Sequence, residues 1–151
     1  MKRRTKGLLY ILGLIGLLIG FLIGRSAWQA RRPADMPANS VWIDAPAVPF
    51  GFYRGWWLGC WIDTDRTSNR CRLWASDGLQ TVYEGIYISC NDKLPVPADE
   101  LQPKSQKEID WVGYSKGNIF APAVYLQNGK VLVPSETPRA CEELQQKANL
   151  K

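Results

Sequence analysis

The chain contains no histidine among its 151 residues. This absence excludes His-dependent catalytic triads and the usual zinc hydrolase sites, because both need an imidazole. The sequence also lacks a P-loop, a dinucleotide-binding fingerprint and a nucleophile elbow, which are the signatures of nucleotide-dependent and α/β-hydrolase chemistry. We therefore expect neither a metal nor a cofactor.

Acidic residues are missing from residues 1–32, although that segment holds seven of the 19 Lys and Arg residues. The rest of the chain has 12 Lys and Arg residues against 14 Asp and Glu residues, a net charge of −2. The overall charge of +5 thus belongs to the N-terminal segment. A nucleic-acid-binding protein needs a basic patch on its folded part, so we expect no nucleic-acid partner.

Charge of either sign is absent from the 18-residue run Gly7–Gly24. As a helix this run is about 27 Å long, close to the hydrocarbon thickness of a bilayer. We predict a basic tail (1–6) and a transmembrane signal-anchor helix (7–24). Basic residues flank both ends, four before (Lys2, Arg3, Arg4, Lys6) and three after (Arg25, Arg31, Arg32). The richer flank tends to stay in the cytoplasm. We therefore expect an inner-membrane, single-pass protein with its C-terminal domain in the periplasm or outside the cell.

The alternative to an anchor is a cleaved signal peptide, whose apolar core usually has about 7–15 residues and ends in a small-x-small site. This run is longer, and the following RSAWQARR has no clean site of that kind. A retained anchor is the better prediction. Gly16, Gly20 and Gly24 lie on one helix face, a spacing that allows close packing of a second helix, either a homodimer or another membrane protein. The alternative is that glycine is simply common in membrane helices.

Prolines recur after the apolar run at positions 33, 37, 46 and 49, among Ala, Asn and Ser. A helix cannot continue through such a stretch, so residues 25–54 are predicted to be an extended spacer. The folded domain is then expected over residues 55–148. About 100 residues can bury one modest core.

Cysteine is absent before Cys60, and the four cysteines all follow the apolar run. An even number in a small domain outside the cytoplasm predicts two disulfides, with four buried thiols as the alternative. Zinc is disfavoured because no close Cys-x-x-Cys pair is present. We predict Cys60–Cys71, which the hairpin described next places opposite each other, and hence Cys90–Cys141.

The segment from Trp56 to Ser89 is predicted to be a three-stranded antiparallel meander, with strands at 56–63, 70–76 and 79–89. Asp77-Gly78 is a strong two-residue hairpin signal, as is Asn128-Gly129 between later β-rich runs at 118–127 and 130–133. Thr137-Pro138 predicts the start of a C-terminal helix over 138–148. The expected fold is one transmembrane helix, a small mainly-β domain (meander, sandwich or barrel) and a short C-terminal helix.

Alternation along the predicted strands separates two faces of the meander. Pairing Cys60 with Cys71 and Leu73 with Val82 gives an aliphatic core face that also carries Glu84 as a discordant residue. The opposite face carries five aromatic residues, predicted to bind ligand: Trp57, Trp61, Trp74, Tyr83 and Tyr87. Such rings could stack on an envelope glycan. The alternative is that residues 109–134 cover them as a second layer.

Carboxylates are the remaining candidates for catalysis. Glu84 could act as a general acid, with Asp63 and Asp65 as a second carboxylate site, as a two-carboxylate glycosidase requires. The alternatives are an ion pair for Glu84 and turn chemistry for the two aspartates. Asp63, Asp65, Thr67 and Asn69 alternate as calcium ligands do, but the loop glycine and distal Glu are missing.

These features predict a membrane-anchored envelope protein that binds or assembles rather than catalyses. Its partners would be the lipid bilayer and either an envelope glycan or a membrane protein. The alternative is a membrane-tethered, carboxylate-dependent hydrolase of envelope polymers.

Overall fold

A computed structural model describes residues 2–44, 55–113 and 120–149. The chain forms two compact units, Met1–Arg31 and Arg32–Lys151. Each unit is described by itself below. Tyr114 and the prolines at positions 46 and 49 lie outside the described residues.

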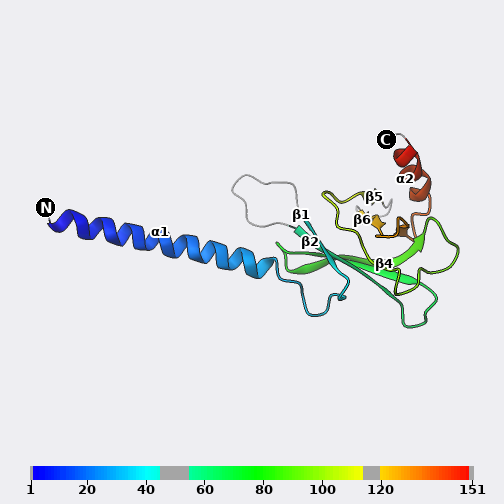
Figure 1. The fold of residues 1–151 in the computed structure, drawn as a ribbon, viewed down its shortest axis with the longest axis horizontal. Helices are drawn as coiled ribbons and strands as arrows, with labels where there is room; N and C mark the ends of the chain where they lie inside the picture. Colours follow the sequence, from blue (N-terminus) through cyan, green and yellow to red (C-terminus); the bar gives the residue numbers. More distant parts are fainter. Residues whose placement is uncertain (1, 45–54, 114–119, 150–151) are drawn as a thin grey trace. The chain divides into compact units, whose positions relative to one another are not determined.

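The first unit is one helix, α1 (Lys2–Gln29), which contains the predicted span (Figure 1). Its stretch Lys6–Arg25 is long and apolar enough to cross a membrane. The large apolar side chains of this stretch are exposed in the structure, from 38% for Leu22 to 76% for Tyr10. In water, a helix that is apolar all round would expose apolar side chains on every side. Such a helix is therefore stabilised when lipid or protein surrounds it.

The second unit is built on a six-stranded antiparallel sheet in the order β1-β2-β3-β4-β8-β7. Its strands are β1 (Val41–Asp44), β2 (Gly55–Ile62), β3 (Asn69–Ala75), β4 (Gln80–Ser89), β7 (Val124–Tyr125) and β8 (Val131–Pro134). A short ribbon pairs β5 (Trp111–Gly113) with β6 (Phe120–Pro122). The sheet is curled into a half-barrel, so the predicted mainly-β fold is confirmed.

The long loop after β4 (residues 90–110) connects the two edges of the curled sheet. The Lys104 N–H donates to the carbonyl of Tyr125 on β7 over 2.7 Å, and Ser105 Oγ donates to the carbonyl of Trp42 on β1 over 3.2 Å. Hydrogen bonds therefore tie both edge strands to one loop. Edge strands that are covered in this way are protected from pairing with other chains.

The core fills the concave side of the half-barrel. It includes Leu58, Leu73 and Tyr87 from the sheet and Val96 and Leu101 from the long loop, all of them almost fully buried. Asn69 is also fully buried, and its amide both donates to and accepts from the backbone of Val96. The loop thus covers the aliphatic face predicted from the sequence, and it does so with satisfied polar groups.

The strand register of the meander agrees with the prediction except for a shift of one residue on β4. Cys60 pairs with Cys71, and next to the Asp77-Gly78 turn Ala75 pairs with Gln80. A bulge between Leu73 and Trp74 then leaves an extra residue on β4, so Leu73 pairs with Tyr83 and not with the predicted Val82. A shift of one residue exchanges the two faces of a strand.

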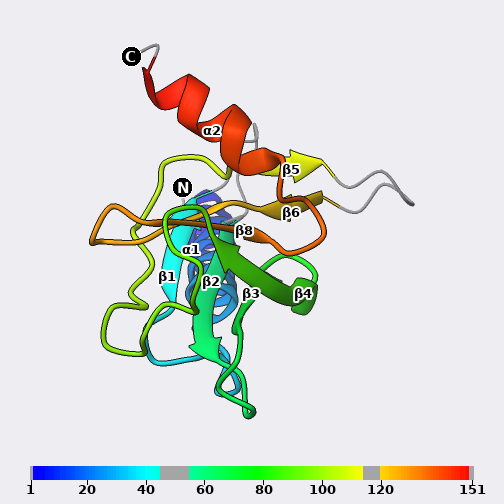
Figure 2. The same cartoon turned by 90° about the vertical axis from the view of Figure 1, so that its right-hand side faces the viewer.

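Both predicted disulfides are present, Cys60–Cys71 and Cys90–Cys141. The first lies in the core between β2 and β3. The second ties the end of β4 to α2 (Ala140–Asn149), which lies near β8 in Figure 2. Cys90, Cys141 and Leu144 pack on a second apolar cluster that contains Val133 and Ala140.

Residues 33–40, predicted to be extended spacer, instead form two successive turns. The Met36 N–H donates to the carbonyl of Pro33, and the Ser40 N–H donates to that of Pro37. Met36 is buried at 4% exposure. Within the predicted spacer, residues 25–29 belong to α1 and Val41–Asp44 form β1. We refer to residues 33–40 as the double-turn segment.

Candidate functional site

The convex side of the meander, here called the outer face, brings together three of the five aromatic residues predicted as a ligand surface. Trp57, Trp61 and Trp74 point away from the core, since their strand neighbours Leu58, Cys60 and Leu73 point into it. Trp74 is nonetheless buried at 9% exposure. Trp57 and Trp61 are half-buried and form the accessible part of this surface.

Tyr83 and Tyr87 lie on the opposite side, so the prediction that they share the face of the tryptophans is wrong. The bulge places them on the core side, where Tyr87 is 2% exposed and its hydroxyl donates to the carbonyl of Pro122. Burial raises the pKa of the Tyr87 phenol. The same shift moves Val82, Ile86 and Ile88 out of the predicted core face, to exposures of 37–43%.

Trp42 on β1 was not predicted to belong to this surface. It pairs with Trp57, and the two rings meet edge to face with centroids 5.4 Å apart. Its indole N–H donates to Asp44 Oδ1 over 2.6 Å. Edge-to-face contacts of this kind hold aromatic rings in fixed orientations.

Charged side chains continue the outer face beyond the tryptophans. Arg72 donates to Glu84 Oε2 over 2.7 Å and to Asp35 Oδ2 over 2.8 Å. Arg70 donates to Glu84 Oε1 over 3.3 Å and to Asp63 Oδ2 over 2.8 Å. Five groups of alternating charge thus form one network, and its end at Asp35 joins the double-turn segment to the sheet.

The three carboxylates considered for catalysis are all engaged. Glu84 lies between two arginines on the outer face. This position explains why a carboxylate was out of place on the predicted core face. Asp63 binds Arg70, and this hydrogen bond is the main cause that raises the pKa of the guanidinium. Hydrogen bonds from Thr67 hold the pKa of Asp65 below its ordinary value. Within residues 2–44, 55–113 and 120–149, no group of three or more His, Cys, Asp or Glu side chains could hold a metal ion.

Arg72 also contacts an aromatic ring. Its guanidinium carbon lies 5.5 Å from the centroid of the Trp61 ring, within the range of a cation–π contact. Because Arg72 is held by two carboxylates, it holds Trp61 in turn. The Trp61 ring is therefore a preoriented aromatic surface.

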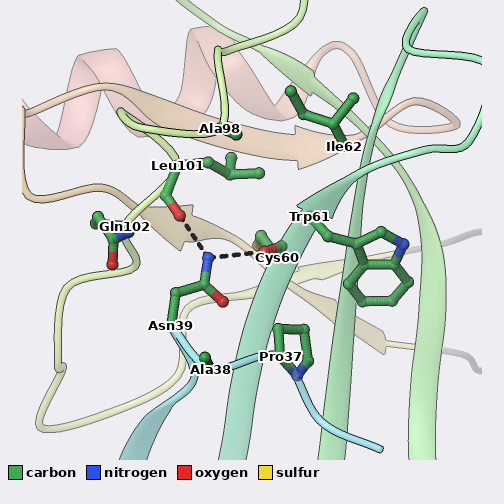
Figure 3. A pocket seen from close by; sticks show the side chains of 9 residues that line it. All are labelled: Pro37, Ala38, Asn39, Cys60, Trp61, Ile62, Ala98, Leu101 and Gln102. Atoms are coloured by element: carbon green, nitrogen blue, oxygen red, sulfur yellow. Dashed lines mark hydrogen bonds between the residues drawn. The ribbon is translucent and has the colours of Figure 1, made fainter.

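A cavity of about 470 Å³ lies beside Trp61, along the edge of β2 (Figure 3). Its wall comes from three segments far apart in the sequence: the double-turn segment, the end of β2 and the long loop after β4. The lining residues are Pro37, Ala38, Asn39, Cys60, Trp61, Ile62, Ala98, Leu101 and Gln102. Small-molecule sites have similar volumes and a similar mixture of apolar walls and few polar groups.

Asn39 is the polar residue that joins these three segments. Its Nδ2 donates to the carbonyl of Cys60 over 2.8 Å and to that of Leu101 over 2.6 Å, as the dashed lines in Figure 3 show. Its Oδ1 is buried and has no hydrogen-bond partner among the described residues. Buried polar atoms of this kind are uncommon in folded proteins.

The double-turn segment packs tightly on β2. A Cβ atom on Gly59 would collide with Ser40 Oγ and lie 3.0 Å from Pro37 Cδ. Gly59 is therefore required here by the close approach of another segment.

Comparisons of the chain with protein-family models, with curated proteins and with solved structures gave no match. Function must therefore be argued from the site itself.

Asn39 and Trp42 were missed because both lie in the predicted spacer. The available signal was the pair of sequences Pro33-Ala-Asp-Met and Pro37-Ala-Asn-Ser, each of which has Pro with Asp or Asn in turn positions. Such residues indicate turns as readily as a spacer. The contact between these turns and β2 is not visible in local sequence.

Proposed function

We propose that this chain is a single-pass membrane protein whose half-barrel domain lies outside the cytoplasm and binds a glycan of the cell envelope. The observation that carries the proposal is the preoriented Trp61 ring beside a cavity of about 470 Å³. Aromatic rings beside a few fixed polar groups suit flat, partly apolar ligands such as sugar rings.

The proposed location rests on α1 and on the disulfides. A stretch of 20 residues, Lys6–Arg25, matches the length of a membrane span. Two disulfides in the second unit favour an oxidising compartment, such as the periplasm or the cell exterior. With the more basic flank inside, we infer an inner-membrane protein with a cytoplasmic N-terminus.

This location can be tested by a C-terminal reporter combined with thiol labelling in intact cells. We expect an external reporter and four cysteines that resist labelling until they are reduced. Freely labelled cysteines together with a cytoplasmic reporter would contradict the proposed location.

Binding is better supported than hydrolysis. A two-carboxylate glycosidase needs its acid and its base to face a bound substrate. Glu84 and Asp63 both face arginines within the outer network, at 2.7–3.3 Å. Their ion pairs stabilise the charged outer face and account for their positions.

The experiment that tests the function is sedimentation of the full chain, in detergent, with purified envelope polymer. We expect co-sedimentation that Trp61→Ala abolishes while the unfolding midpoint stays within a few degrees of that of the parent protein. Trp111→Ala is a matched control, since Trp111 is 44% exposed and is not among the residues that line the cavity. If the parent protein does not sediment with any envelope glycan, the proposal fails.

A second contact, between α1 and another membrane helix, remains a prediction. A Cβ atom added at Gly16, Gly20 or Gly24 meets nothing within 4 Å in the structure, so this face of α1 is open to a second helix. We propose that it packs against another copy or another membrane protein. Leucine at Gly16 and Gly20 should then disrupt co-purification without changing sedimentation with glycan.

A further inference from the structure

The wall of the cavity includes a residue, Asn39, whose buried acceptor has no donor among the described residues. Asn39 Oδ1 is buried without a partner among the described residues, and a buried acceptor in this state destabilises the folded chain. Rotating the amide by 180° would not help, because Oδ1 would then face the carbonyl oxygens that Nδ2 now binds at 2.6 and 2.8 Å. The acceptor position is therefore fixed, and it calls for an N–H or O–H from outside the described contacts.

The edge of β2 restricts which kind of molecule can supply a donor to Asn39 Oδ1. β1 begins with Val41 opposite Leu58, so no described strand lies beside Cys60 and Ile62 on this edge. The Cα atoms of Cys60 and Cys71 are 4.1 Å apart, which is typical of a non-hydrogen-bonded pair, so the Cys60 carbonyl faces away from β3. An added peptide strand would need that carbonyl, but Asn39 Nδ2 already occupies it. The edge is capped against strand addition.

The remaining walls suit a small amide with an apolar group attached. Ala98, Leu101 and Ile62 offer apolar side chains, and Trp61 offers a ring that Arg72 holds in place. An acetamido group has one N–H donor, one methyl group and one carbonyl oxygen, which points away from the N–H and would face solvent. A sugar ring that carries it has an apolar face of the kind that stacks on an indole.

We propose that this cavity binds the acetamido group of a 2-acetamido sugar. The N–H of the acetamido group donates to Asn39 Oδ1, its methyl group lies against the apolar wall, and the sugar ring stacks on Trp61. Because Oδ1 is buried, the ligand has to displace the atoms that cover it, while Asn39 Nδ2 keeps its hydrogen bonds to the carbonyls of Cys60 and Leu101. The inference rests on the proposed function and names the part of the glycan that is recognised.

The test uses the full chain in lipid nanodiscs and two matched β-1,4-linked trisaccharides. One is the trimer of N-acetylglucosamine, and the other is the trimer of glucose, which replaces each acetamido group by a hydroxyl. Tryptophan fluorescence measures affinity, and the ¹⁵N-labelled side-chain amide of Asn39 reports contact. We expect about tenfold tighter binding of the acetamido trimer and a shifted Asn39 signal with that trimer alone. Trp61→Ala should lose this binding, whereas Trp111→Ala should keep it.

Three results would overturn the inference. Equal binding of both trimers would show that the acetamido group is not recognised, although the protein would still bind glycan. Tighter binding of the blocked peptide N-acetyl-dialanine methylamide would assign the cavity to a peptide. Failure to bind either trimer by a protein that still sediments with envelope polymer would place the glycan elsewhere, so the two proposals fail separately.

Discussion

The inner and outer faces of the same three strands differ in how they are held together. The inner face is apolar and buried, is joined by the Cys60–Cys71 disulfide, and leaves Leu58 and Leu73 without exposed surface. The outer face is aromatic and charged and is held by four ion-pair contacts, with a cavity at its margin. Burial of apolar side chains on the inner face stabilises the fold most. The outer face instead offers exposed polar groups of fixed orientation, which are available for recognition. Substitutions on the two faces should therefore have different effects.

The largest effect is expected for Leu73→Ala on the inner face. Leu73 is fully buried, and removal of a buried leucine side chain costs about 2–5 kcal/mol, because a cavity remains. Val82→Ala is the outer control, since Val82 is 43% exposed and should change stability by about 0.5 kcal/mol or less. Urea unfolding of both variants measures the difference. Similar losses would contradict the assignment of faces by the bulge.

An intermediate effect is expected at alkaline pH from Tyr87. Burial raises the pKa of its phenol in the folded protein above the ordinary value of about 10. The stabilisation by the neutral phenol is complete below pH 10 and is lost as the pH rises toward the folded-state pKa. Above pH 10 the unfolded chain loses this proton while the folded chain keeps it, so the free energy of unfolding should fall by about 1.4 kcal/mol per pH unit.

Urea unfolding between pH 8 and pH 11 measures this dependence, and Tyr87→Phe provides the comparison. The variant loses the hydrogen bond to the Pro122 carbonyl, so it should be less stable at pH 8. Its stability should then fall less steeply with pH. An unchanged slope in Tyr87→Phe would mean that other groups cause the alkaline loss.

The smallest effect is expected for Glu84→Gln on the outer face. Glu84 contacts Arg70 and Arg72, but its side chain is 29% exposed, and exposed ion pairs contribute about 1 kcal/mol or less. Most of this difference should disappear in 1 M NaCl, because salt screens exposed charges. A loss well above that value, or one that salt does not reduce, would show that the network is part of the core stability.

The predictability of the fold differs from one residue to the next. The Asp77-Gly78 turn correctly set the register next to it, where Ala75 faces Gln80. The bulge then added one residue, and this alone moved Tyr83 and Tyr87 inward and Glu84 outward. Bulges have weak sequence signals, because they reflect how a sheet must curl around its core. The structure contains ion pairs between Glu84 and two arginines, which was the alternative to a catalytic role for this residue.

The candidate site was less predictable than the fold. Trp57 and Trp61 could be placed on one face because they are four residues apart in a strand, and side chains on a strand alternate between faces with a period of two. Asn39 contributes only because it contacts Cys60 and Leu101, which are 21 and 62 residues away along the chain. Such contacts depend on how the segments pack, and the composition of the double-turn segment is equally compatible with a spacer.

The sequence by itself determined the apolar helix, the strands of the meander, the positions of both hairpin turns and the disulfide partners. These features depend on local composition, alternation and turn chemistry, which act within a few residues. Only the tertiary structure decided which face each residue of β4 occupies, where residues 33–40 pack, and that a cavity forms beside Trp61 with a buried acceptor that no described residue pairs. The physical reason is that one extra residue in a strand and the docking of a distant turn change the surroundings of side chains without changing any local pattern.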